Sequence, residues 1–266
     1  MTETNDLVLV ERNGHAATVI LNRPEKLNAL NKAMWVQLGE AMQALHHDED
    51  LRCIVLRGAG DKAMGPGADI KEFETERANA AQAAEYGAIM HTAMASIGDC
   101  RHPVVAMIKG LCIGGALELS LMCDLRICGA SSRFGIPINR LGLVMSYPEI
   151  EALIATVGRS TALEILYEGR VFGAEEALAK GLVNRIVADD EVEGEVGETV
   201  ARICAGAPLV NRWHKAFANR IARGIHEGQP LDPSEAADGF ACFDTADFNE
   251  GYQAFVEKRS PVFKGQ

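Results

Sequence analysis

GLCIGGALELSLMCD, residues 110–124, is the stretch that decides the fold of this chain. The residues directly before it, PVVAMIK (103–109), are almost all apolar and predict a buried strand. Gly110, Gly114 and Gly115 then predict a tight turn, and the apolar residues that follow predict a helix. The order of elements is therefore a strand, a glycine turn and the start of a helix.

The start of this predicted helix is a place where negative charge is stabilised. The first backbone N–H groups of a helix have no partner inside the helix, and the helix dipole favours an anion there. A group that becomes an oxyanion during a reaction could bind at such a point. Glu118 follows Gly115 by three residues, within one helical turn. Its neighbours are apolar, so the sequence predicts a buried carboxylate, which is costly unless it has a function.

Length and charge restrict the class of protein. The chain has 266 residues, a length typical of one domain with an appendage rather than two full domains. Its formal net charge of −11 argues against nucleic-acid binding, which needs a basic face. A polyanionic ligand would have to be held by local basic residues and N–H groups against the field of the whole protein.

Cysteine and histidine spacing predicts no disulfides and no metal. The seven cysteines include no CxxC pair, which is typical of a reducing compartment. The seven histidines form no HExxH pattern. The first residues lack a signal-peptide pattern, and no apolar run is long enough to span a membrane. We therefore expect a cytoplasmic protein without a metal ion.

Strands and helices alternate along the chain, which predicts a mixed α/β fold. Asn13-Gly14 predicts a hairpin, and Asn31 is a typical helix cap. The predicted elements are a hairpin over 7–22, a helix over 31–47, strands over 53–58 and 124–129, a helix over 78–97, a short helical region from about Pro148, a strand over 182–187, and helices from about Asp189 to the end, broken near Pro208 and at 228–233.

A second glycine loop, KAMGPGADIKEF (62–73), follows the same logic as the first. Its glycines let the backbone approach a ligand closely. Pro66 has no N–H, whereas Gly67 and Ala68 can donate hydrogen bonds. If the N–H groups of Ala68 and Gly115 met at one point, they would form an oxyanion hole with two donors. Two unrelated glycine loops are the alternative, which spacing alone leaves open.

Six stretches of the chain, in order, resemble the enoyl-CoA hydratase/isomerase family, or crotonase superfamily. They are LNRPEKLNAL (21–30), GPGADIKEF (65–73), HPVVAMIKGLCIGGALELSLMCD (102–124), FGIPINRLGL (134–143), GRVFGAEEALAKGLVNRIV (169–187) and KRSPVFKG (258–265). The resemblance covers nearly the whole chain. It implies an α/β spiral of repeated ββα units over 1–188, a C-terminal helical region for oligomerisation or a lid over 189–266, and a homotrimer or a dimer of trimers.

The resemblance also implies an acyl-CoA thioester substrate and a set of site residues. Ala68 and Gly115 match the family positions whose N–H groups hold the thioester oxygen, and Glu118 matches the first catalytic glutamate. Coenzyme A arrives with the substrate, so no separate cofactor is expected. The positions implied to contact CoA are Glu25, Lys26, Leu27, Pro66, Gly67, Asp69, Ile70, Phe263 and Lys264.

One position departs from the family pattern. Hydratases of the family carry a second glutamate in an FGxPE element, where this chain has Ile138. Syn addition of water needs both a base and an acid, and losing one such group costs roughly 100- to 10,000-fold in rate. One hypothesis is therefore a hydratase in which Glu118 works with another group from the next segment. The candidates are Ser146, Tyr147 and Glu149.

Two other hypotheses remain open at this stage. The chain could catalyse a different reaction of the superfamily, such as isomerisation or decarboxylation, or it could bind CoA thioesters with little catalysis. The sequence favours the hydratase, because Glu118 and both amide positions are intact. A nucleotide-binding dehydrogenase is disfavoured because the glycines do not follow the GxGxxG pattern. Tyr86, His91 and Met94 are candidates to line the acyl pocket, whose length the sequence does not predict.

Overall fold

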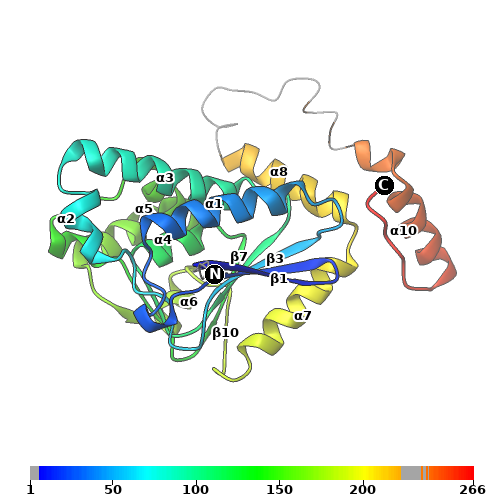
Figure 1. Ribbon diagram of the computed structural model, residues 1–266. Helices are drawn as coiled ribbons and strands as arrows, with labels where there is room; N and C mark the ends of the chain where they lie inside the picture. Colours follow the sequence, from blue (N-terminus) through cyan, green and yellow to red (C-terminus); the bar gives the residue numbers. More distant parts are fainter. Residues whose placement is uncertain (1–5, 223–234, 236–237, 239) are drawn as a thin grey trace, which may run out of the picture.

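A computed structural model describes residues 6–222, 235, 238 and 240–266 of the chain (Figure 1). Within these residues the strands form two sheets. The larger sheet has the order β1-β2-β3-β5-β7-β10, and its strands are β1 (Val8–Asn13), β2 (Ala16–Leu21), β3 (Cys53–Gly58), β5 (Val104–Ile108), β7 (Leu125–Gly129) and β10 (Arg185–Val187). The smaller sheet has the order β4-β6-β8-β9, with β4 (Ala63–Gly65), β6 (Leu111–Ile113), β8 (Arg133–Gly135) and β9 (Phe172–Gly173).

A ββα unit repeats along the chain. In each unit the first strand joins the larger sheet, the second joins the smaller sheet, and a helix follows. The units are β3-β4 with α3 (Ala80–Gly98), β5-β6 with α4 (Gly115–Leu121), and β7-β8 with α5 (Tyr147–Glu168). Strands β3, β5 and β7 pair in parallel, as do β4, β6 and β8. The α/β spiral of repeated units expected from the sequence is therefore confirmed.

Helices cover both faces of the larger sheet. Helix α1 (Lys32–His47) packs against α3 on one side, and α7 (Val192–Ala205) packs on the other side (Figure 1). The remaining helices are α2 (Phe73–Glu76), α6 (Ala174–Ala179), α8 (Pro208–Ala222) and α10 (Ala246–Glu257), with 3-10 turns η1 (Pro24–Lys26), η2 (Ile70–Glu72), η3 (Pro137–Leu141) and η5 (Ala241–Asp244). Within the described residues, no helix combines the length and apolar character that a membrane span requires.

Most predicted elements form close to the expected residues, but the turn predicted after Gly110 contains β6, the strand predicted over 182–187 is β10 alone, and two helical regions differ. Strands β1 and β2 pair as the predicted hairpin, and the Asn31 side chain caps α1 by accepting the Met34 N–H at 2.9 Å. The helical region α5 is long rather than short, and it consists of two helical segments that meet at a kink at Gly158, whose φ of +76° and ψ of 157° are not helical. The chain is not helical to its end, because Lys258 adopts a left-handed conformation that closes α10. The predicted break at 228–233 lies outside the described residues.

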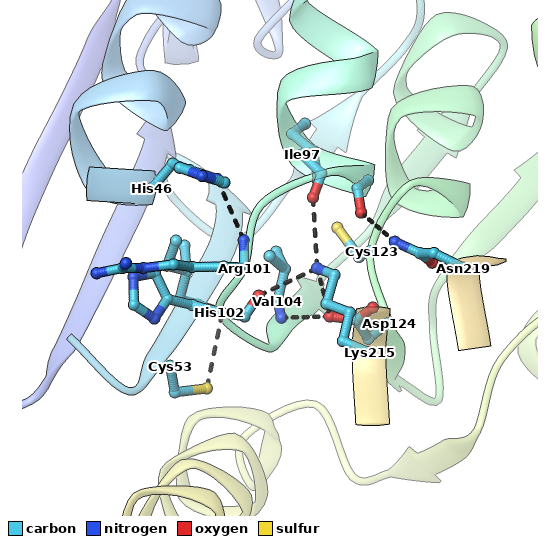
Figure 2. A network of polar contacts seen from close by, with 12 residues as sticks. His46, Cys53, Ile97, Arg101, His102, Val104, Cys123, Asp124, Lys215 and Asn219 are labelled. Atoms are coloured by element: carbon cyan, nitrogen blue, oxygen red, sulfur yellow. Dashed lines mark hydrogen bonds and ion pairs between the residues drawn. The ribbon is translucent and has the colours of Figure 1, made fainter. Parts of the chain in front are cut away.

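A buried lysine fixes the C-terminal part of the chain to the core. Lys215 of α8 reaches the end of α3 and the start of β5, as Figure 2 shows. Its Nζ donates to the carbonyl of His102 at 3.0 Å and lies 2.9 Å from Oδ2 of Asp124. The same carboxylate accepts the N–H of Val104 at 2.7 Å. Because a buried charge is costly unless it is paired, this network sets the place of α8. The predicted boundary at 188–189 falls between β10 and α7, and the predicted roles of 189–266 stay predictions.

We expect Gly110→Ala to destabilise the protein by about 3 kcal/mol or more, because the glycine combines strain with a close contact. Gly110 has a φ of +64°, and a Cβ added there would lie 1.9 Å from the Lys62 carbonyl oxygen. Urea unfolding would measure the loss as a lower midpoint at an unchanged slope. Gly60→Ala is the matched control, since Gly60 has a φ of +71° but nothing within 4 Å. Equal midpoint shifts in the two variants would contradict the role of the contact.

Candidate active site

One large cavity brings together residues from distant parts of the chain. It has a volume near 860 Å³, within the range of about 300–1,000 Å³ typical of small-molecule sites. Its wall includes Ala68 from the second glycine loop, Gly115 and Glu118 from α4, and His91 from α3. The first turn of α5 closes the cavity with Glu149. Most of the remaining wall is apolar.

Two backbone amides lie side by side at this cavity. A Cβ added to Gly115 would lie 3.9 Å from the nitrogen of Ala68, and one added to Gly67 would lie 3.5 Å from the nitrogen of Gly115. Neither N–H donates a recorded hydrogen bond within the described part of the chain. The hydrogen bonds that hold the second glycine loop do not use the Ala68 N–H. Gly115 is the first residue of α4, where an N–H group has no partner inside the helix. Both amides are therefore free to bind an acceptor in the cavity.

Hydrogen bonds and an ion pair from residues 23–30 fix the second glycine loop (62–73) in this position. Leu30 donates its N–H to the Gly67 carbonyl at 2.9 Å, and its own carbonyl accepts the Asp69 N–H at 2.8 Å. The Arg23 guanidinium pairs with the Asp69 carboxylate at 3.0 Å. Gly67 has a φ of +105°, which favours glycine. Leu30 thus pairs with the residues on both sides of Ala68, and the Ala68 N–H takes no part in this pairing.

Glu118 is a buried carboxyl group that lines the same cavity as the two amides. It is 7% exposed and belongs to the first turn of α4, which begins at Gly115. Burial raises the pKa of Glu118 to about 8, the Glu149 carboxylate raises it as well, and the Arg77 guanidinium acts in the opposite direction. Glu118 therefore holds a proton near neutral pH, and a group with such a pKa is suited to proton transfer there.

Glu149 enters the same cavity from α5 as part of a polar cluster. It is 4% exposed, and its Oε2 accepts the N–H of Ser146 at 2.5 Å. The Nε2 of His91 lies 3.1 Å from Glu149 Oε1 and 2.8 Å from Ser146 Oγ. The three side chains, which we call the α5 cluster, all line the cavity. Each oxygen of a carboxylate can accept more than one hydrogen bond, so these contacts leave further acceptor positions on Glu149.

The structure shows which of the other candidates for the second catalytic group line the cavity. Ile138 lines the cavity, so the position that carries a glutamate in family hydratases presents an apolar side chain here. Tyr147 is 91% exposed and is not among the lining residues. Its neighbour Ser146 does line the cavity, because the N-cap and the N3 residue of α5 face inward while the first residue of the helix faces outward.

The positions implied to contact CoA divide into two groups. Pro66, Gly67, Asp69 and Ile70 line the cavity, although the Asp69 carboxylate is already bound to Arg23. The other five are not among the lining residues, and they are Glu25 and Lys26 of η1, Leu27 after it, and Phe263 and Lys264 near the C-terminus. Their contacts with CoA stay predictions.

Sequence reasoning did not single out two arginines of the site. Arg23 forms an ion pair with Asp69 of the second glycine loop, and Arg77 lines the same cavity as Glu118. Arg23 lies in the LNRPEKLNAL stretch (21–30), where the sequence predicts no role for it, and Arg77 lies outside the six stretches that resemble the family, so no local signal points to it. His91 lines the cavity, whereas Tyr86 and Met94 are buried in the core around it. Among residues 6–222, 235, 238 and 240–266, no group of three or more His, Cys, Asp or Glu side chains is suited to a metal ion.

Repeated ββα units around a cavity with two adjacent amides define the crotonase class of proteins. Comparison with known proteins agrees over almost the full length: the sequence pattern described as "Enoyl-CoA hydratase/isomerase" matches residues 11–266. The chain therefore belongs to the enoyl-CoA hydratase/isomerase family, whose members support its assignment as an enzyme.

Individual relatives support the same family assignment. The chain is 34% identical to a crotonyl-CoA hydratase of Syntrophomonas wolfei, with 96% of this chain and 97% of that protein covered. A crystal structure of an enoyl-CoA hydratase/carnithine racemase from Magnetospirillum magneticum superposes with a TM-score of 0.95 at 47% identity, covering 99% and 97% of the two chains. An enoyl-CoA hydratase structure from Bacillus anthracis gives a TM-score of 0.89 at 31% identity, covering 98% and 100%.

Proposed function

We propose that this protein is an enoyl-CoA hydratase that adds water syn across the double bond of a 2-enoyl-CoA. The observation that carries the proposal is the position of Glu118 and Glu149 in one cavity with the paired amides of Ala68 and Gly115. Two carboxyl groups and two N–H donors are the groups that this reaction needs. The names of relatives such as the crotonyl-CoA hydratase of Syntrophomonas wolfei also support it.

The paired amides stabilise the charge that forms during the reaction. When the water oxygen bonds to the β-carbon, the electrons of the double bond move through the thioester carbon onto its oxygen. The resulting enolate oxygen accepts hydrogen bonds from the N–H groups of Ala68 and Gly115. Removing one such donor in other enzymes raises the barrier by about 2.7–4 kcal/mol, so the pair is a large contributor to the rate.

The two carboxyl groups move the protons. Glu149 accepts a proton from the attacking water, and the Nε2 of His91 at 3.1 Å stabilises the cluster in which it does so. Glu118 starts protonated, because burial raises its pKa to about 8, and gives its proton to the α-carbon of the enolate. Afterwards a proton passes from Glu149 to Glu118 through water, which restores both groups. Glu149 thus has the role of the second glutamate of family hydratases, whose position is occupied by Ile138 in this chain.

The rest of the ligand is assigned on the same basis. CoA enters as part of the substrate, and the reaction needs no other cofactor, so we expect full activity in the presence of a chelator. Pro66, Gly67 and Ile70 stand at the cavity wall where the pantetheine and adenine parts would pass. Lys26 and Lys264 would supply positive charge to the phosphates, Lys264 across the interface of a homotrimer. The trimer and the cytoplasmic location are part of this proposal.

The test is a turnover assay with crotonyl-CoA. We expect the absorbance of the conjugated thioester to fall and 3-hydroxybutyryl-CoA to appear. The same enzyme is then given a 3-enoyl-CoA and a malonyl-type CoA. A double-bond shift or release of carbon dioxide, without any hydration of crotonyl-CoA, would show that the protein catalyses a different reaction of the superfamily. Binding of CoA thioesters without any product would show that it is not a hydratase at all.

A further inference from the structure

Arg77 places a guanidinium group at the wall of the cavity. It follows α2 and precedes α3, and it lines the cavity together with Phe73 and Met90. Its guanidinium carbon lies 3.7 Å from the centroid of the Tyr86 ring and 5.1 Å from that of Phe73. An arginine stacked on a ring in this way keeps the donors at the edge of its plane available for hydrogen bonds.

Two of the carboxylates on the elements nearest Arg77, Glu72 and Glu76, have other partners, and Glu74 and Glu85 are exposed. Glu72 accepts the Lys32 N–H at 2.9 Å and the Tyr86 hydroxyl at 3.1 Å. Glu76 pairs with the Lys32 ammonium at 2.7 Å. The recorded polar contact of Arg77 is with the sulfur of Met90 at 3.8 Å, which is a weak acceptor. In the described part of the chain Arg77 therefore forms no recorded ion pair.

The carboxyl groups that line the cavity do not neutralise Arg77 either. Asp69 pairs with Arg23, and both oxygens of Glu149 face the other members of the α5 cluster. Burial raises the pKa of Glu118 to about 8 although the charge of Arg77 lowers it, so Glu118 is largely protonated at neutral pH. A cation in a mostly apolar cavity gains most from an anionic ligand group that can accept its edge donors.

We propose that Arg77 selects acyl groups that carry a carboxylate at the end remote from the thioester. This inference rests on the proposed function, because that places the thioester carbonyl at Ala68 and Gly115. Arg77 lines the same cavity as Gly115 and Glu118, so we place its guanidinium in the acyl part of that cavity rather than at the surface where CoA phosphates would lie. Phe73 and Met90 supply the apolar wall for the methylene groups between the thioester and the carboxylate.

The experiment uses saturated thioesters, which bind but do not react. Calorimetry would compare two acyl-CoAs of matched length, one ending in a methyl group and one in a carboxylate, and free CoA. Because a hydrogen bond to a charged group contributes about 1.5–3 kcal/mol, we expect the carboxylate to bind roughly 10- to 150-fold more tightly than the methyl group. Arg77→Met should abolish this preference and leave the affinity for the methyl compound close to that of the wild type.

Controls separate this inference from its alternatives. Arg159→Met changes an exposed arginine of α5 that does not line the cavity, and it should keep the preference. Arg77→Gln is a second variant that should act like Arg77→Met if the latter is poorly folded. A wild type without the preference, or a preference that survives in both Arg77 variants, would overturn the inference. So would an equal loss of affinity for both thioesters and free CoA, since that is the result for a phosphate contact.

The proposed function and this inference fail in different ways. Saturated thioesters report on binding alone, so the preference for a carboxylate can appear even where crotonyl-CoA is not hydrated. In that case only the hydratase proposal is wrong. Hydration of crotonyl-CoA without any preference in the binding experiment would leave the hydratase proposal intact and remove the role of Arg77.

Discussion

Glu118→Gln is expected to lower the turnover of crotonyl-CoA by roughly 100- to 10,000-fold, the range typical of losing a positioned acid or base. The amide of glutamine fills the same space but has no proton to give to the α-carbon. The amides of Ala68 and Gly115 remain in place, so binding of the thioester should change much less than turnover. The loss of absorbance of the conjugated thioester measures the rate, and calorimetry with a saturated thioester measures the affinity.

The pH dependence of stability tests whether the pKa of Glu118 is raised in the folded protein. The pKa of Glu118 is raised from 4.5 to about 8, so between these values the folded protein holds a proton that the unfolded chain releases. The stability of the wild type therefore falls as pH rises through this range, and Glu118→Gln removes that fall. We expect the free energy of unfolding of the variant, relative to wild type, to rise from pH 5 towards pH 8.

A matched control tests whether the loss of turnover is specific to the glutamate at position 118. Glu151→Gln changes an exposed glutamate of α5 that is not among the lining residues, and its turnover should equal that of the wild type. Wild-type turnover should also decline as pH rises above about 8, where Glu118 loses its proton in the free enzyme. If Glu118→Gln turned over crotonyl-CoA at the wild-type rate, Glu118 would have no part in the chemistry.

Glu149→Gln is expected to cause a loss of similar size, roughly 100- to 10,000-fold, because the attacking water then lacks its base. This is the sharper prediction, since Glu149 does not stand at the position where family hydratases carry their second glutamate. The glutamine oxygen can still accept the Ser146 N–H, so the start of α5 should be kept. Turnover is measured as for Glu118, and thermal unfolding checks that stability is little changed.

The double variant tests whether the two carboxyl groups act in one reaction. Groups that act as a unit show strongly non-additive effects, so Glu118→Gln with Glu149→Gln should lose little more than either single variant. Two losses that multiply would instead mean that the two residues contribute independently. Full turnover in Glu149→Gln would rule out Glu149 as the base and leave the rest of the α5 cluster, His91 and Ser146, as the groups to test.

The parts of the site that depend on local sequence could be predicted. The helix start at Gly115 was predicted, and the free amide of Gly115 and the buried carboxyl of Glu118 follow from it, although the stretch predicted as a turn also contains β6 (Leu111–Ile113). The hairpin at Asn13-Gly14 and the cap at Asn31 are equally local and also formed as predicted. The four strands of the smaller sheet were not predicted, because none exceeds three residues and such runs have no readable period.

The sequence by itself determined the two glycine loops and Glu118, because turn formation and helix starts depend on residues close together in the chain. Only the tertiary structure decided which side chains meet them. Ser146, Tyr147 and Glu149 are equivalent candidates in the sequence, yet packing of α5 turns Ser146 and Glu149 into the cavity and Tyr147 out to solvent. Arg77 reaches the same cavity only because α2 and α3 fold over it, a contact that no local pattern encodes.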